Sequence, residues 1–202
     1  MTVQLVLTER RVDLTESRAR NYERLRSRLA AASGLAIDDV HYEELVPEQL
    51  TRADAIVLSG SSAPWSSHEP AALARLGDAV RAADRPVLGI CAGLQLQALF
   101  AGGELGPSAA EQRGFQPVTL RDRSDLFRDL PEEIVVFEDH TDEVTVLPES
   151  FRVLASSATC AVQAIADPAR RWWGTQFHPE EFSSEHPAGE RVLRTFFELV
   201  SS

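Results

Sequence analysis

The sequence predicts an α/β protein with an open, mostly parallel central sheet flanked by helices, together with a small antiparallel part. Two observations support this fold class. In the first half of the chain, short aliphatic runs alternate with helical patterns, which is typical of right-handed strand–helix–strand units. Runs such as residues 86–90 are apolar at every position, as expected for strands in the middle of a parallel sheet.

The first strand is predicted at residues 3–7, VQLVL, and a helix follows it. Thr15 is a suitable N-cap for that helix, because its hydroxyl can accept a hydrogen bond from the first turn. Apolar residues then recur at spacings of three and four, at Ala19, Tyr22, Leu25 and Leu29.

The next elements continue the parallel pattern. Residues 54–60, DAIVLSG, predict a buried strand that runs into a loop, and residues 69–83 predict a helix. Residues 86–90, PVLGI, predict another strand, and a helix is expected to begin near Ala92. The spacing of these elements favours crossover connections between parallel neighbours.

The pattern changes after residue 100. Shorter, strand-like pieces follow, and we expect some of them to be antiparallel: residues 104–120, 133–140, 142–147, 152–165 and 171–177. The chain then closes with an amphipathic helix at residues 187–200. No repeat or convincing linker interrupts the 202 residues, so we expect one domain over residues 1–202.

Composition excludes several classes of partner. The net charge of −11 argues against a nucleic-acid partner, because that binding begins with a basic face. No apolar run approaches the ~20 residues that span a bilayer, and the N-terminus lacks a secretory signal. Two distant cysteines indicate free thiols in a reducing compartment, so we expect a cytoplasmic protein with no membrane contact.

Every one of the 20 basic residues is arginine. The absence of lysine excludes Schiff-base chemistry and the lysine of a P-loop phosphate site. No cofactor or metal site is predicted, since the acidic run EDHTDE (138–143) is more typical of a solvated turn. Any nucleotide chemistry linked to this chain must therefore come from another polypeptide.

Cys91 occupies the junction between a predicted strand and a predicted helix. Active groups of open α/β sheets collect at the carboxyl ends of strands, and Gly89 and Gly93 permit a sharp turn there. The N-terminus of the helix carries a partial positive charge that favours a thiolate. Cys91 is therefore a candidate nucleophile, whereas Cys160 lies within a strand pattern and is expected to be a small core residue.

A base and its orienting group are predicted in the stretch WWGTQFHPEEF. Pro179 favours extended backbone at His178, and residues two apart in an extended chain point to the same side. His178 and Glu180 would then project together, with Glu180 accepting a hydrogen bond from the imidazole. The alternative is a surface histidine and glutamate at a strand end, which the cysteine junction makes less favourable.

The stretches PVLGICAGLQ and GTQFHPE resemble the two catalytic signatures of class I, triad-type glutamine amidotransferases. The family pattern G-x-C-x-G-x-Q is met by Gly89, Cys91, Gly93 and Gln95. A third stretch, VLSGSSAP (57–64), occupies the place of the oxyanion loop of that family. The resemblance implies a flavodoxin-like fold with Cys91, His178 and Glu180 as the catalytic triad.

The resemblance also implies the remaining contacts with L-glutamine. Backbone N–H groups of Ser61 and Ala92 would stabilise the oxyanion, and Gly60 and Gln95 would contact the substrate. The loop departs from the usual family pattern Ser-Gly-Gly-Pro, because Ser61 and Ser62 follow Gly60. A side chain at position 61 predicts that the loop requires a partner or ligand to become productive.

The stretch from residue 140 onward resembles the glutaminase portion of GMP synthases, where the pattern H-G-D-x-V-x-x-L-P occurs. His140 and Asp142 match this pattern, and Thr141 replaces its glycine. By resemblance, all three lie beside the glutamine site; the alternative is a polar turn between two strands. The N-terminus does not resemble that of GMP synthases.

These observations predict a glutaminase that hydrolyses L-glutamine through a Cys91 thioester and passes ammonia to a separate synthetase partner. Two alternatives stay open. A γ-glutamyl hydrolase would use the same triad on γ-glutamyl amines or peptides. A non-catalytic, glutamine-sensing regulatory protein would use only the pocket, and the unusual loop is the feature that favours it.

Overall fold

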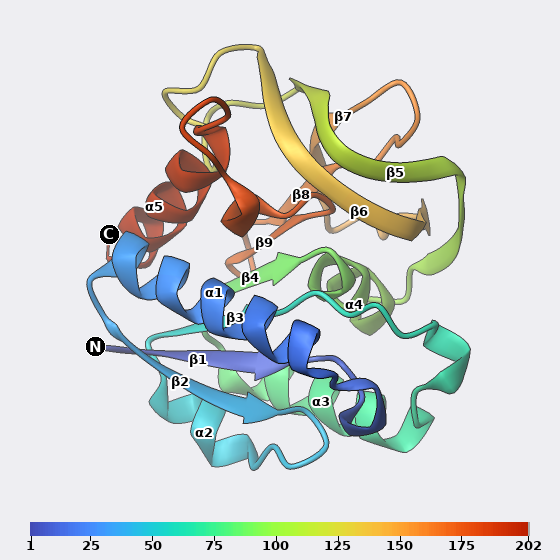
Figure 1. Cartoon of the computed structure of the whole chain (residues 1–202). Coiled ribbons are helices and arrows are strands. Elements are labelled where there is room, and N and C mark those ends of the chain that lie inside the picture. Colours follow the sequence, from blue (N-terminus) through green and yellow to red (C-terminus); the bar gives the residue numbers. More distant parts are fainter. Residues whose placement is uncertain (202) are drawn as a thin grey trace.

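The computed structural model describes residues 1–201, without the side chains of residues 109–111. Within that range the chain forms a nine-stranded sheet with the strand order β2-β1-β3-β4-β9-β8-β7-β5-β6. Helices cover both faces of the sheet (Figure 1). The predicted α/β class, with a parallel and an antiparallel part, is confirmed.

The parallel part contains the N-terminal half of the chain and one late strand. Adjacent strands run parallel from one edge inward: β2 (Ala36–His41), β1 (Thr2–Leu7), β3 (Ala55–Leu58), β4 (Val87–Ile90) and β9 (Trp172–Thr175). Strands β3, β4 and β9 are buried at every position, and the apolar runs of β3 and β4 predict this burial. Because β9 pairs with β4, residues far apart in sequence leave the sheet side by side.

The antiparallel part consists of β8 (Ala164–Asp167), β7 (Arg152–Ser156), β5 (Glu104–Leu120) and β6 (Glu133–Val146). The prediction of separate short pieces at 133–140 and 142–147 was wrong, since both belong to β6. A register shift in β5, between Pro107 and Gln112, lets the long pair bend while it stays paired. The β5–β6 pair arches over one end of the sheet (Figure 1).

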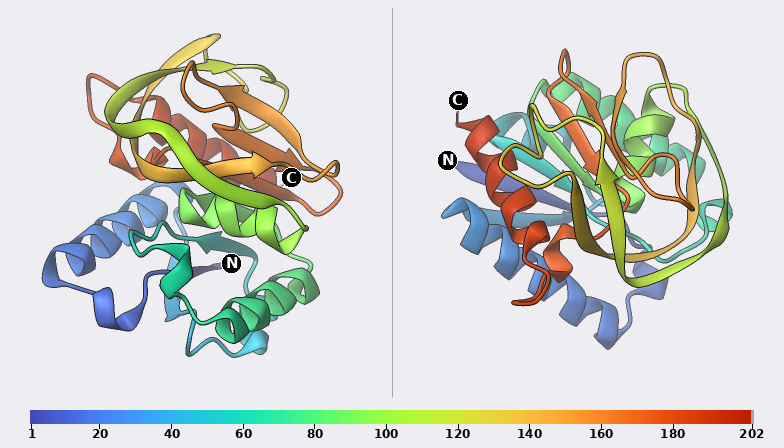
Figure 2. Two further views of the ribbon diagram at one scale, coloured as in Figure 1. Left: turned by 90° about the vertical axis from the view of Figure 1, so that its right-hand side faces the viewer. Right: turned by 90° about the horizontal axis from the view of Figure 1, so that it is seen from above.

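The helices form two layers, one on each face of the sheet (Figure 2). One layer holds α1 (Glu16–Ser33) and α5 (Ala188–Val200), whose apolar sides share a core that includes Leu25, Leu29 and Phe196. The other layer holds α2 (Pro47–Arg52), α3 (Pro70–Ala83) and α4 (Ala92–Phe100). None of the helices within residues 1–201 is long and apolar enough to cross a membrane.

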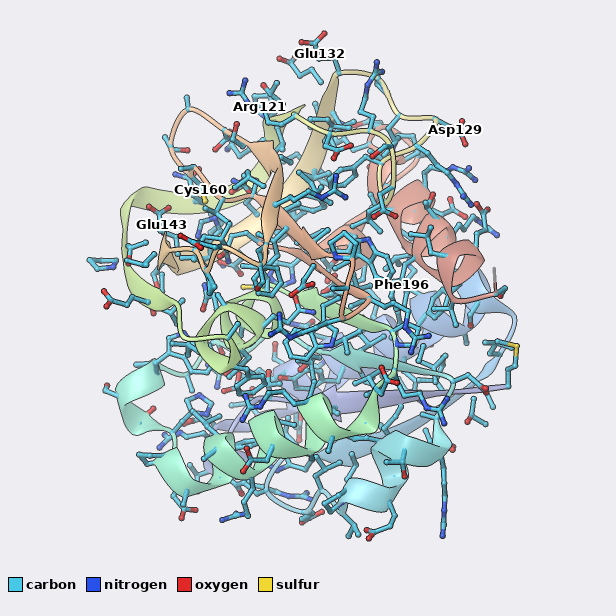
Figure 3. All side chains as sticks on the ribbon, turned by 180° about the vertical axis from the view of Figure 1, so that it is seen from behind. Arg121, Asp129, Glu132, Glu143, Cys160 and Phe196 are labelled. Carbon is cyan, nitrogen blue, oxygen red and sulfur yellow. The ribbon has the colours of Figure 1, made fainter. Side chains whose placement is uncertain are left out.

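The predicted N-cap of the first helix and the apolar side of the last helix are both found in the structure. The hydroxyl of Thr15 accepts a hydrogen bond from the N–H of Arg18 at 3.3 Å and so caps α1. Phe196 lies on the side of α5 that faces the sheet (Figure 3), and its ring centroid is 6.0 Å from that of Trp173. The first contact stabilises the start of α1, and the second packs α5 against β9.

Cys160 is buried, as predicted, but it does not lie in a strand. It belongs to the loop between β7 and β8, next to Glu143 (Figure 3). Burial raises the pKa of the Cys160 thiol to about 12, with the charge of Glu143 acting in the same direction. A thiol in this state is a weak nucleophile, which agrees with a packing role.

Candidate active site

Cys91 is the residue that turns the chain from β4 into α4. Its backbone adopts φ 50° and ψ −105°, a conformation that side chains rarely take. Its N–H donates a hydrogen bond of 2.7 Å to the carbonyl oxygen of Thr175 on β9. Such strain costs of order 1–3 kcal/mol and persists only where the surroundings enforce it.

Two glycines enforce this turn by close backbone approach. A Cβ at Gly89 would lie 2.5 Å from the carbonyl carbon of Gly93, inside α4. A Cβ at Gly93 would lie 2.3 Å from the carbonyl oxygen of Leu58 on β3. Since neither position can hold a larger residue without moving backbone, α4 is pressed onto β3 and β4 with Cys91 at its N-terminus.

His178 follows β9 and is held by a neighbouring strand. Its backbone N–H donates a hydrogen bond of 2.8 Å to the carbonyl oxygen of Phe137 on β6. Its own backbone is extended, with φ −97° and ψ 92°, as the following proline dictates. The expectation of extended backbone through Glu180 was wrong, because Pro179–Glu181 forms a short 3₁₀ turn.

The 3₁₀ turn nevertheless brings Glu180 to the imidazole. Nδ1 of His178 lies 2.9 Å from Oε1 of Glu180, and the carboxylate is buried. Because an ionised carboxylate only accepts, Nδ1 is the donor, and Nε2 is the nitrogen that is free to act on a thiol.

The surroundings of Gly60 show that the side chains of Cys91 and His178 lie close together. A Cβ placed on Gly60 would lie 3.0 Å from Cε1 of His178 and 3.6 Å from Cβ of Cys91. Both side chains therefore lie against the same side of Gly60, which has room only for hydrogen. The structure thus brings together Cys91, His178 and Glu180 from two segments of the chain.

Charge stabilises the protonated form of His178. Burial alone lowers the pKa of the imidazole, but the negative charge of Glu180 and that of Cys91 raise it well above its usual value. Hydrogen bonds to the same two residues act in the same direction. The arrangement places a positively charged imidazole beside the sulfur of Cys91, and such a neighbour activates a cysteine nucleophile.

The two backbone N–H groups expected to stabilise an oxyanion come from two different segments of the chain. Ala92 is the first residue of α4, and Ser61 follows Gly60 in the loop after β3. Neither N–H donates a hydrogen bond within the described residues. Both groups are therefore free to donate to a bound ligand.

The loop at residues 59–62 is held by residues that sequence reasoning missed. The carboxylate of Glu9 accepts hydrogen bonds from the hydroxyl of Ser61 at 3.2 Å and from the hydroxyl of Ser62 at 2.7 Å. The carbonyl oxygen of Gly60 accepts bonds from Thr8 Oγ1 at 3.1 Å and from Tyr22 Oη at 3.0 Å. Nothing local in the sequence links these residues, since about 40 to 50 positions separate the partners.

A cavity of about 540 Å³ opens beside the thiol. Its size is within the usual range for a small-molecule site. All the residues proposed from sequence line this cavity except Ala92: Gly60, Ser61, Cys91, Gln95, His140, Thr141, Asp142, His178 and Glu180. Helix α1 supplies part of the opposite wall, including Asn21 and Arg24.

The side chain of Gln95 is fully engaged by the protein. Its Oε1 accepts a hydrogen bond of 2.8 Å from Nε1 of Trp65, and its Nε2 donates to the carbonyl oxygen of Asp142 at 2.7 Å. Nε2 also lies 3.1 Å from Oε1 of Gln176, whose own Nε2 is 3.6 Å from the sulfur of Cys91. Gln95 therefore connects Trp65 and Asp142, which line the cavity, with Gln176 beside Cys91.

His140 differs from the polar turn that was the alternative interpretation, because it lies inside strand β6 and is buried. Its Nε2 is 2.9 Å from Oε2 of Glu138, which also accepts from Gln163 at 2.9 Å. The expectation that the acidic run 138–143 is solvated was thus wrong for Glu138 and His140. Thr141 is exposed and Asp142 half-buried at the rim of the cavity.

Within the described residues, no group of three or more histidine, cysteine or acidic side chains could hold a metal ion. The arrangement brings a thiol and an imidazole together at one cavity, and the backbone N–H groups of Ser61 and Ala92 have no partner among the described residues. These are the parts required for attack on an amide carbon through a covalent thioester.

Comparisons with known proteins agree with this chemistry. The sequence profile of the family described as "Glutamine amidotransferase class-I" matches residues 17–200. A GMP synthase (glutamine-hydrolyzing) of Syntrophomonas wolfei is 40% identical over 163 residues, which cover 80% of this chain and 30% of that protein. A protein of Thermoplasma acidophilum named as one subunit of GMP synthase (glutamine-hydrolyzing) is 36% identical over 154 residues, which cover 76% of each chain.

A solved structure gives the same result. The crystal structure of a T. acidophilum protein, described as a GMP synthase subunit, matches with a TM-score of 0.82 and 29% identity, over 98% of this chain and 94% of that one. The chain spans only about 30% of the length of the first curated relatives it matches. The similarity to those longer proteins therefore concerns one part of them.

Proposed function

Because the chain belongs to the class I glutamine amidotransferases, we propose that it is the glutaminase subunit of a two-subunit amidotransferase of the GMP-synthase type. It hydrolyses L-glutamine to glutamate and passes the ammonia to a separate synthetase. The similarity to a GMP synthase subunit over 76% of both chains supports the two-subunit arrangement. The observation that carries the proposal is the meeting of Cys91 and His178 beside Gly60, with Glu180 behind the imidazole.

The first half of the reaction forms a thioester. The Cys91 thiolate attacks the side-chain amide carbon of glutamine, a C–S bond forms, and the carbonyl electron pair moves to oxygen. The N–H groups of Ser61 and Ala92 stabilise this oxyanion, and each such donor contributes about 3–4 kcal/mol to lowering the barrier. The oxyanion then collapses, and the imidazolium of His178 gives its proton to the departing ammonia.

The second half releases glutamate. His178, now neutral, accepts a proton from water as the water attacks the thioester carbon. A second oxyanion forms in the same place and collapses with loss of the Cys91 thiolate. Glu180 holds the imidazole in one tautomer throughout and stabilises its charged form, which recurs in each half.

A separate polypeptide supplies the acceptor chemistry. The chain contains no lysine and thus lacks the P-loop lysine that cradles nucleotide phosphates. Two relatives that match over 60% and 76% of their own length carry names of GMP synthase subunits rather than of complete synthases. We therefore place the amination step on a partner synthetase that binds the nucleotide.

The direct test measures glutamate and ammonia released from L-glutamine by the purified chain, alone and with the synthetase subunit from the same genome. Turnover of glutamine, with loss of turnover in Cys91→Ala, is the expected result. Parallel assays with γ-glutamyl amines distinguish a γ-glutamyl hydrolase, which would prefer them to glutamine. Absence of glutamine turnover under both conditions would contradict the proposal.

A further inference from the structure

The carboxylate of Glu9 is buried beside the cavity but takes no part in the triad. It lies in the turn after β1, and only 3% of its side chain is exposed. Oε1 accepts from the hydroxyl of Ser61 at 3.2 Å. Oε2 accepts from the N–H of Ser62 at 3.0 Å and from its hydroxyl at 2.7 Å, and the guanidinium of Arg18 lies 3.4 Å away.

These partners hold the carboxylate of Glu9 in place. Both oxygens accept hydrogen bonds from the loop, and the guanidinium of Arg18 on α1 lies beside Oε2, so the protein itself compensates the buried charge. The same partners make Glu9 a rigid attachment point. Three of the donors belong to Ser61 and Ser62, the two residues at which the loop departs from the Ser-Gly-Gly-Pro pattern.

The bonds to Glu9 constrain the side chain of Ser61 and the peptide that follows Ser61. The N–H of Ser62 points to Glu9, so the peptide between Ser61 and Ser62 cannot rotate without losing a charge-assisted hydrogen bond. On the other side, Thr8 and Tyr22 fix the carbonyl of Gly60. The Ser61 N–H belongs to the same peptide as the Gly60 carbonyl, and Glu9 holds the next peptide and the Ser61 hydroxyl, so the backbone of Ser61 is held on both sides.

We propose that Glu9 is a positioning residue, which holds the Ser61–Ser62 backbone so that the Ser61 N–H is aimed at the oxyanion formed on Cys91. The proposal rests on the proposed glutaminase function. In the usual family pattern a flexible glycine pair occupies this part of the loop. Here two serines occupy it, and the bonds from their hydroxyls to Glu9 hold them in one conformation. On this proposal the loop is already formed without a ligand or partner, contrary to the expectation from the side chain at position 61.

Replacement of Glu9 tests this role through kcat and KM. Glu9→Ala is expected to lower kcat for glutamine hydrolysis roughly tenfold to a hundredfold, less than the loss of a complete oxyanion donor, with KM changed less than about threefold. Glu9→Gln is expected to recover most of the activity, because its amide oxygen can still accept from the Ser62 N–H. Asp54→Ala is the matched control, because it removes an acceptor for the N–H of Thr2 at the opposite end of β1.

Alkylation of Cys91 by iodoacetamide separates positioning from a general structural effect, because that reaction forms no oxyanion. Wild type and Glu9→Ala are expected to react at equal rates, with similar thermal unfolding temperatures. A parallel loss of alkylation and kcat would overturn the proposal, and so would full activity of Glu9→Ala. Wild-type protein that is inactive with and without its synthetase would contradict the proposed function itself, whereas an active wild type with an equally active Glu9→Ala contradicts only the role of Glu9.

A double-mutant cycle gives an independent check. Ser62→Ala removes one of the hydroxyl donors to Glu9. If Glu9 acts through the loop, the loss of kcat caused by Glu9→Ala becomes smaller in the Ser62→Ala background. Strictly additive losses would show that the two residues act separately, and would overturn the proposal.

Discussion

Nδ1 of His178 donates a hydrogen bond to Oε1 of Glu180 at 2.9 Å, while the second carboxylate oxygen, Oε2, is buried without a partner among the described residues. A buried carboxylate usually spreads its charge over several donors. Here one imidazole is the main partner of the carboxylate. The pair therefore stabilises a positive charge on His178 rather than serving as an ordinary surface ion pair.

Replacement of Glu180 by glutamine should leave the shape of the site intact and remove this charge. We expect kcat to fall roughly 10²- to 10⁴-fold, because the amide no longer enforces the required tautomer. The pKa of His178 should fall toward its usual value, since the negative charge of Glu180 raises it in the wild type. NMR titration of the imidazole measures the shift, and an unchanged titration would contradict this account.

Stability should depend on pH through the same pair. The pKa of His178 is raised in the folded protein, so its contribution to the free energy of unfolding is fully present below about pH 6.5. The contribution is lost as pH rises through the higher pKa of the folded state. Urea unfolding between pH 6 and 9 should show a steeper decline for wild type than for Glu180→Gln, and equal slopes would be inconsistent with the raised pKa.

The strained turn at Cys91 predicts an order of stability among inactive variants. Cys91→Ala and Cys91→Gly should both abolish glutamine turnover, since neither carries a nucleophile. Glycine accepts φ 50° without strain, so Cys91→Gly should unfold with a free energy about 1 kcal/mol larger than that of Cys91→Ala. Chemical denaturation measures both, and the reverse order would show that the turn is relaxed.

A single methyl group at Gly60 should disturb catalysis without unfolding the protein. The added Cβ of Gly60→Ala would lie 3.0 Å from Cε1 of His178 and would displace the ring from Cys91. We expect kcat to fall at least tenfold and the melting temperature to change by only a few degrees. Gly106→Ala on β5 is a suitable control, because the three atoms nearest its Cβ all belong to the side chain of Thr145; comparable losses of kcat in both variants would refute the steric explanation.

Trp65 should influence substrate affinity through Gln95. Its indole N–H donates to Oε1 of Gln95 at 2.8 Å, and both side chains line the cavity. Trp65→Phe keeps the ring but leaves that oxygen without its donor, so we expect KM for glutamine to rise a few fold with kcat nearly unchanged. Steady-state kinetics decide, and a fall in kcat at constant KM would place Trp65 in the chemical step instead.

The turn at Cys91 and the His178–Glu180 pair could be predicted because the signals are local. A strand followed at once by a glycine-flanked cysteine and a helix determines the turn within a few residues. A histidine two residues before a glutamate can reach it in more than one backbone form. His178 and Glu180 therefore meet although the expectation of extended backbone was wrong, because the 3₁₀ turn also brings their side chains together.

The rest depends on contacts that no short stretch encodes. Glu9 and Ser62 are 53 positions apart, and nothing in the N-terminal turn marks a carboxylate as a support for a distant loop. Strand β2 was not predicted, because its sequence, AIDDVH, carries two adjacent aspartates and little alternation. Glu138 and His140 are buried with a hydrogen bond between them, and Gln163 donates a further one to Glu138. Gln163 is distant from Glu138 and His140 in sequence, so no short stretch predicts their burial.

The supports of the 59–62 loop have a consequence for protein engineering. Thr8, Glu9 and Tyr22 all come from the first 22 residues, and the segment that matches the family profile begins only at residue 17. A chimera that exchanged this opening segment for that of a relative would present different groups to the two serines, which donate here to the carboxylate of Glu9. An exchange of segments between relatives should therefore transfer the N-terminal turn that carries Glu9 together with the 59–62 loop that it holds.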